Sequence, residues 1–180
     1  MLGRLFRSDG VLDGIASDIY GAIVARARTP AIYADLGVPD TVAGRFEMVA
    51  LHMVVAMERF GSGTHRERDI GQRVFELFCT DMDQTLREFG VGDAVMGKRM
   101  KKMARGFYGR SAAYTQALTT DDRDQLAAVL GRNIYPGEER AADVRLSDYA
   151  RSFRLAFIAV ESGALEKGAV AVPLPSHGTQ

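Results

Sequence analysis

The sequence has a single cysteine, no excess of charge of either sign and no long uninterrupted apolar run. One cysteine, Cys79, cannot form a disulfide within the chain, so we expect a reducing compartment and a cytoplasmic location. Lys and Arg total 23 and Asp and Glu also total 23, so the chain has no general attraction for nucleic acid, and DNA is not an expected partner. The longest apolar run, residues 48–57, is broken only by His52 and has about half of the ~20 residues that a membrane-spanning helix needs. We expect it to be a buried core helix.

Signatures of catalysis and metal binding are missing as well. The chain has no G-x-S-x-G elbow, no P-loop and no dinucleotide-binding fingerprint. Asp81 and Asp83 would point about 200° apart on a helix, so they do not form a catalytic carboxylate pair. One cysteine and three scattered histidines give no metal-ligand spacing, and His52 is expected to be a hydrogen-bonded core residue. We therefore expect no enzymatic activity, no metal and no cofactor.

Apolar residues recur at helical spacing through most of the chain, and strand-like alternation of useful length is not found. The spacing predicts helices at about residues 11–28, 42–60, 66–89, 94–118, 120–131 and 147–163, with N-caps at Asp40 or Thr41, at Thr120 and at Ser147 or earlier. The second of these helices is apolar on most of its circumference and should be central. The inward-facing residues of the last helix should be Tyr149, Phe153, Leu155, Ala156, Ile158 and Val160. We predict an all-α, single-domain bundle of about six helices over residues 1–163, followed by a loosely ordered tail at residues 164–180.

The third and fourth predicted helices should form a long antiparallel hairpin. Gly90 is suited to a left-handed C-cap, Val91 can fold back on the helix, and Asp93 is a good N-cap after Gly92. The structural turn is thus predicted at Gly90, Val91, Gly92 and Asp93. Two helices joined so tightly should share one core.

The fourth predicted helix is the strongest candidate for an interaction surface. Residues 98–110 carry six cations and no acid: Lys98, Arg99, Lys101, Lys102, Arg105 and Arg110. Part of this charge could pair with Asp81 and Asp83 across the hairpin, or the face could simply be solvated. Phe107 falls on the core stripe, whereas Tyr108 should meet the edge or the solvent. We select Lys98, Lys101, Lys102, Arg105, Tyr108 and Arg110 as candidate partner-binding residues.

A second polar cluster lies near residues 33–47. Helix capping explains Asp40 and a turn explains Gly37, which leaves Tyr33, Asp35 and Arg45 without a structural role. We expect these three residues to lie close to the hairpin and to complete one binding surface with Tyr108 and Arg110.

Two segments, YADLGVPDTVAGRFEMVALH at residues 33–52 and REFGVGDAVMGKRMKKMARGFYGR at residues 87–110, resemble the ubiquinol–cytochrome c chaperone family. The resemblance implies a non-enzymatic chaperone that binds newly made cytochrome b, or an assembly intermediate of it, while respiratory complex III is built. It also implies a small helical partner protein or the ribosome as further contacts. The absence of a Ser-rich and Arg-rich presequence fits a bacterial member.

Two alternatives stay open. The chain could instead bind a small molecule (a quinone, a haem or a lipid) in a helical pocket lined by methionines. The N-terminal residues Leu2, Arg4, Leu5, Phe6 and Arg7 could make a peripheral contact with the inner membrane, or could form only a frayed first turn.

Overall fold

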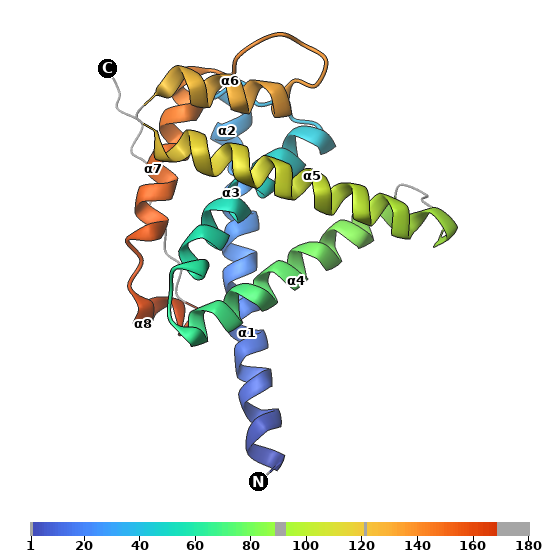
Figure 1. The fold of residues 1–180 in the computed structure, drawn as a ribbon, viewed down its shortest axis with the longest axis vertical. Coiled ribbons are helices and arrows are strands. Elements are labelled where there is room, and N and C mark those ends of the chain that lie inside the picture. The colour runs from blue at the N-terminus through green and yellow to red at the C-terminus, as the bar shows by residue number, and fades with distance from the viewer. Residues whose placement is uncertain (1, 89–92, 121, 169–180) are drawn as a thin grey trace.

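The computed structural model describes residues 2–88, 93–120 and 122–168, with side chains for residues 10–85, 87, 105–120 and 122–168. Every element within these residues is a helix (Figure 1). In chain order the elements are α1 (Leu2–Ala27), α2 (Pro30–Ala34), α3 (Val42–Gly61), α4 (His65–Glu88), α5 (Asp93–Thr119), α6 (Arg123–Ile134), α7 (Val144–Ile158) and α8 (Ser162–Leu165). Six of these helices have at least twelve residues, and α2 and α8 are short. The predicted all-α class is confirmed.

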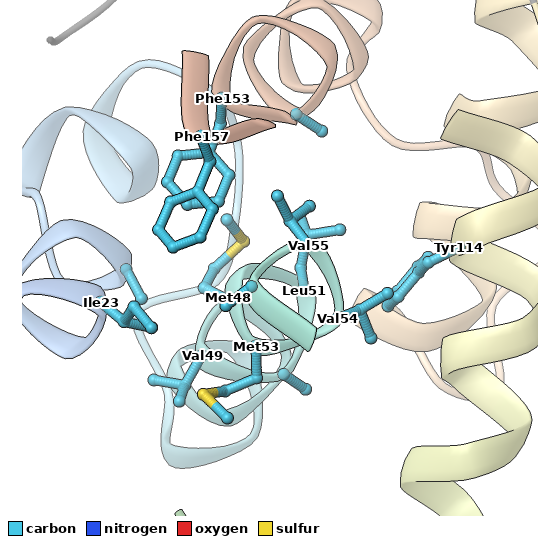
Figure 2. Close-up of a cluster of buried hydrophobic side chains, with 14 of the residues drawn as sticks. Ile23, Met48, Val49, Leu51, Met53, Val54, Val55, Tyr114, Phe153 and Phe157 are labelled. Atoms are coloured by element: carbon cyan, nitrogen blue, oxygen red, sulfur yellow. The ribbon is translucent and has the colours of Figure 1, made fainter. Parts of the chain in front are cut away.

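Helix α3 is the centre of the fold, as its composition predicts. Its N-cap is Thr41, whose side chain accepts a hydrogen bond from the backbone N–H of Gly44. All residues from 47 to 56 are buried, and α3 contacts α1, α4, α5, α6 and α7. Figure 2 shows its apolar side chains pointing in several directions, toward Ile23 of α1, Tyr114 of α5 and Phe157 of α7. A helix that is apolar on all sides is stable only when other helices surround it.

One apolar core includes side chains from all eight helices, among them Ile19 of α1, Ile32 of α2 and Leu165 of α8. The predicted tail at residues 164–180 begins inside this core, because Leu165 is fully buried in α8. The rest of that tail, from residue 169 onward, lies outside the described residues.

Helices α4 and α5 run in opposite directions and diverge from the end where they are joined (Figure 1). Helix α4 is fastened to α1, because the Tyr20 hydroxyl donates a hydrogen bond of 2.8 Å to Asp81. Helix α5 packs mainly on α6 and α3. The predicted turn at Gly90, Val91 and Gly92 lies outside the described residues, and only the backbone of Asp93, the first residue of α5, is described.

The connection between α3 and α4 is held by a buried ion pair. Arg59 Nη2 lies 2.8 Å from Glu67 Oε1, and the Glu67 side chain has no exposed surface. Glu67 and Thr64 also form a capping box, in which each side chain accepts a hydrogen bond from the other residue's backbone N–H. Arg59 donates in addition to the backbone oxygen of Val160. These contacts link the start of α4 to the end of α7.

Two sequence predictions need correction. Helix α6 is capped by Asp122, whose carboxylate accepts from Gln125 N, while the hydroxyl of Thr120 instead donates to Ala117 O of the preceding helix. The start of α7 at Val144, after a cap at Asp143, agrees with the expected cap at Ser147 or an earlier residue. Leu155 and Ile158 were expected to face inward but are exposed. The buried stripe of α7 runs through Tyr149, Phe153 and Phe157. Leu155 lies two positions from both Phe153 and Phe157, about 200° around the helix, and therefore points away from the core. Ile158 is the last residue of the helix and lies beside the stripe.

Candidate functional site

A groove lined largely by apolar and aromatic side chains crosses the surface where α3, α4 and α5 meet. Its volume is about 300 Å³. We call it the aromatic groove and define it by its lining residues: Met57, Phe60, Gly61, Arg68, Gly71, Gln72, Phe75, Phe107, Tyr108 and Ser111. The groove therefore lies at the C-terminal end of α3 and the N-terminal half of α4.

Aromatic rings form its wall between α4 and α5. The ring centroids of Phe75 and Phe107 are 5.5 Å apart, and those of Phe75 and Tyr108 are 6.4 Å apart. Phe107 also packs on Phe78, at 5.2 Å. Tyr108 is 63% exposed although it contacts two other rings. As the sequence predicts, Phe107 is buried and Tyr108 meets the solvent.

Gly71 allows α4 to lie close to the end of α3. A Cβ atom at this position would come within 2.6 Å of Phe60 Cβ and 2.8 Å of its ring. Any larger residue would push the two helices apart and change the shape of the groove.

The groove has positive charge on both sides of Tyr108. Arg68 lines it from α4, and its guanidinium donates a hydrogen bond of 2.7 Å to Gly63 O. Arg105 is exposed and lies three residues before Tyr108, on the same side of α5. The side chains of Lys98, Lys101 and Lys102 are outside the described residues, so their predicted role stays a prediction.

Arg110 points away from the groove and toward α3. Its Nη2 lies 2.8 Å from Glu47 Oε1, and the side chains of Arg110 and Glu47 are 26% and 6% exposed. The guanidinium also lies over the Phe46 ring, 5.5 Å from the centroid. Burial raises the pKa of Glu47 to about 7 even though Arg110 acts to lower it. In the structure Arg110 thus joins α5 to α3 through an ion pair. Its predicted contact with a partner protein stays a prediction.

The polar cluster near residues 33–47 is partly brought together. Arg45 Nε lies 2.6 Å from Asp40 Oδ1, and the guanidinium is 6.0 Å from the centroid of the Tyr33 ring. The Tyr33 hydroxyl donates to Ala27 O at 2.7 Å, and Asp35 is the exposed C-cap of α2. Local contacts therefore give the side chains of Tyr33 and Arg45 a structural role.

This cluster is not next to the aromatic groove. Arg45 lies in the first turn of α3, whereas the groove begins at Met57, twelve residues later or about 18 Å along the helix axis. Tyr108 lines the groove at the C-terminal end of α3, whereas Arg110 pairs with Glu47, two residues after Arg45, near the N-terminal end of α3. A single client segment would have to extend over that length to contact both.

His52 is a core residue, as expected. Its Nδ1–H donates to Met48 O, and its Nε2 accepts from the Tyr149 hydroxyl, each at 2.7 Å. Burial lowers the pKa of His52 to about 4, so the ring is neutral at physiological pH. The described side chains contain no group of three or more His, Cys, Asp or Glu that could hold a metal ion. None of the described helices is long and apolar enough to cross a membrane.

Several residues that line the groove were not among the candidate binding residues selected from the sequence: Met57, Phe60, Arg68, Gly71 and Phe75. One signal could have identified Phe75. It lies off the buried stripe formed by Ile70, Val74 and Phe78, and an aromatic residue off the buried stripe of an amphipathic helix is a candidate contact. The other walls depend on how α3 and α4 cross, which helical periodicity does not determine.

Comparisons with known proteins identify relatives of the whole fold. The sequence model of a family described as Ubiquinol-cytochrome C chaperone matches residues 34–172, which include every residue of the aromatic groove. A crystal structure of the Cbp3 homolog from Brucella abortus is similar with a TM-score of 0.86 and 38% sequence identity, over 96% of this chain and 97% of that one. None of the curated proteins matches this chain.

Proposed function

Because this chain belongs to the ubiquinol–cytochrome C chaperone family, we propose that it acts as a non-enzymatic assembly chaperone of ubiquinol–cytochrome c reductase, respiratory complex III. In this proposal the client is newly made cytochrome b or an assembly intermediate that contains it. The chaperone covers apolar segments of the client until the other subunits replace it.

The aromatic groove is the observation that carries the proposal. A chaperone needs apolar surface that is accessible yet does not cause the chaperone itself to aggregate. Tyr108 provides such surface, since it is 63% exposed beside Phe75 and Phe107, and the charged Arg68 at the edge keeps the region solvated. Met57 adds a flexible thioether, which adapts to side chains of different shape.

Binding of a small molecule is the alternative, and the size of the groove argues against it. Pockets for cofactors and drug-sized ligands span about 300–1,000 Å³, so a groove of about 300 Å³ is at the lower limit of that range. A larger hollow of about 620 Å³ lies between α5, α6 and residues 138–141. Its lining has no aromatic residue and consists largely of alanines and charged or amide side chains.

Co-purification tests the proposal against this alternative. The affinity-tagged chain is isolated from its native cells, and mass spectrometry identifies both the proteins and the small molecules that accompany it. We expect cytochrome b, and we expect Tyr108→Ala to reduce its recovery while Leu155→Ala does not. Leu155 is the matched control because it is 67% exposed but lies on α7, away from the groove. A stoichiometric quinone, haem or lipid without cytochrome b would contradict the proposal.

The basic residues of α5 should contribute to capture rather than to folding. Reversing four of them to glutamate should weaken recovery of the client and leave the unfolding midpoint nearly unchanged, because the sequence pattern puts them off the apolar stripe of the helix and solvated charges contribute little to stability. The four positions are Lys98, Lys101, Lys102 and Arg105. High salt should mimic the variant, since exposed charges are screened over roughly 8–10 Å at ordinary ionic strength. If the variant unfolds, these residues form an internal ion-pair network instead.

A further inference from the structure

The aromatic groove has room for one large side chain rather than for the face of a whole helix. Its volume is about 300 Å³, and four rings line it: Phe60, Phe75, Phe107 and Tyr108. Aromatic pairs prefer offset or edge-to-face arrangements with centroids about 4.5–7 Å apart, and three of these rings, Phe75, Phe107 and Tyr108, already pack on one another at such distances. An aromatic side chain from outside would extend the same packing and bury the exposed ring of Tyr108.

The charges beside the groove restrict what can surround that side chain. Arg68 stands on the α4 side and Arg105 on the α5 side of Tyr108. The nearby Glu76 accepts a hydrogen bond of 2.8 Å from the Gln72 side chain and keeps its negative charge, so the two arginines exceed it by one positive charge. Two guanidinium groups favour carboxylates and disfavour ammonium groups at the positions that flank the buried ring.

We propose that the aromatic groove recognises a single aromatic side chain flanked by acidic residues on a segment of the client protein. This inference rests on the proposed function, which it deepens by naming the chemistry that the groove selects. The aromatic ring supplies most of the affinity, as central buried aromatic residues do at protein interfaces. The two arginines supply selectivity and speed the encounter.

Short peptides test this recognition directly. One fluorescein-labelled peptide carries a central tryptophan with a glutamate on each side. A second replaces the tryptophan with alanine, and a third replaces both glutamates with lysine. Binding is measured by fluorescence anisotropy. The tryptophan emission of the unlabelled peptide reports whether its ring becomes buried, because this chain has no tryptophan of its own. We expect the alanine peptide to bind at least about tenfold more weakly than the first, the lysine peptide to bind several-fold more weakly, and the tryptophan emission to shift to shorter wavelength.

Variants of the chaperone assign the binding to the groove. Tyr108→Ala should weaken binding of the tryptophan peptide on the order of tenfold. Leu155→Ala, which truncates an exposed residue on α7, should leave that binding unchanged. Ser111→Leu should fill the groove from α5 and weaken binding while Tyr108 is kept, and circular dichroism shows which variants remain folded. Reversing Arg68 and Arg105 together to glutamate should exchange the preference between the glutamate and lysine peptides.

Equal binding of the tryptophan and alanine peptides, or an equal effect of Tyr108→Ala and Leu155→Ala, would overturn the inference. A second copy of this chain could also occupy the groove, and analytical sedimentation of the free chain tests for that. A dimer that Tyr108→Ala dissociates would overturn the inference as well. Capture of cytochrome b with no selective peptide binding would leave the proposed function standing and refute only this recognition. Selective peptide binding without capture of cytochrome b would support the groove and contradict the proposed client.

Discussion

Replacing Glu47 with glutamine should change how the stability of the protein depends on pH. Glu47 is buried on α3 and reaches α5 through one oxygen, which lies 2.8 Å from Arg110 Nη2. Its other oxygen has no hydrogen-bond partner among the described residues. Burial raises the pKa of this carboxyl group from 4.5 to about 7 in the folded protein. The carboxylate is therefore destabilised by the fold in spite of its arginine partner.

The sign and the size of the effect follow from proton linkage. Between its unfolded and folded pKa values, from 4.5 to about 7, Glu47 holds a proton in the folded state that it has lost in the unfolded state. Stability therefore decreases as the pH rises through this window. One pKa unit corresponds to about 1.4 kcal/mol, so the contribution of Glu47 should fall by about 2 to 3 kcal/mol between roughly pH 5 and pH 8.

His52 has the opposite effect. Burial lowers its pKa from 6.5 to about 4, so in this window the unfolded state holds a proton that the folded state lacks, and stability increases with pH. Its contribution should rise by about 2 kcal/mol over the same interval. Because the two effects nearly cancel, these residues should give the unmodified protein little net change of stability between roughly pH 5 and pH 8.

Urea unfolding at the two pH values isolates the Glu47 contribution. Glu47→Gln keeps an oxygen for Arg110 but cannot titrate, so its free energy of unfolding should rise by about 2 kcal/mol between roughly pH 5 and pH 8 because only His52 remains. The matched control is Glu139→Gln, an exposed residue outside the helices, which should follow the unmodified protein. If Glu47→Gln and the unmodified protein differ by the same amount at both pH values, the reasoning is refuted.

Three further substitutions test the packing by urea denaturation. Gly131→Ala should destabilise the protein by about 1–3 kcal/mol, because the new Cβ would lie 2.2 Å from Arg140 O. Gly21→Ala should stabilise it by up to about 1 kcal/mol, because a Cβ there meets nothing within 4 Å and alanine favours a helix; effects of the same sign would contradict this account. Arg59→Met should cost about 3–5 kcal/mol because it leaves the carboxylate of Glu67 buried without its cation. A loss well below that range would mean that Glu67 protonates or reaches solvent.

The helices could be predicted from the sequence because each depends on local periodicity and capping. Helix α3 is apolar on all sides, and Thr41 caps it as one of two expected residues. Helix α2 begins at Pro30, and proline suits the first position of a helix because its missing N–H would have no partner there. The cap at Asp122 was missed because Thr120 is an equally good capping residue by type. The backbone conformation after the end of α5 decides whether Thr120 or Asp122 caps α6.

The candidate site could be predicted only in part, because contacts between distant helices determine it. The exposure of Tyr108 follows from its position one residue off the core stripe. The pairing of Arg110 with Glu47 joins residues 63 positions apart and depends on how α5 crosses α3. The groove depends on the same crossing and on the close approach at Gly71. Periodicity gives the face that a helix buries but does not give the partner on that face.

Photo-crosslinking from position 108 in living cells is the most direct test that the aromatic groove holds cytochrome b. A photoreactive phenylalanine analogue replaces Tyr108 in one strain and Leu155 in another, and adducts are identified after irradiation during active synthesis of complex III. The account predicts a cytochrome b adduct from position 108 and none from position 155. Adducts from position 155 alone, or cytochrome b adducts of equal yield from both positions, would contradict it.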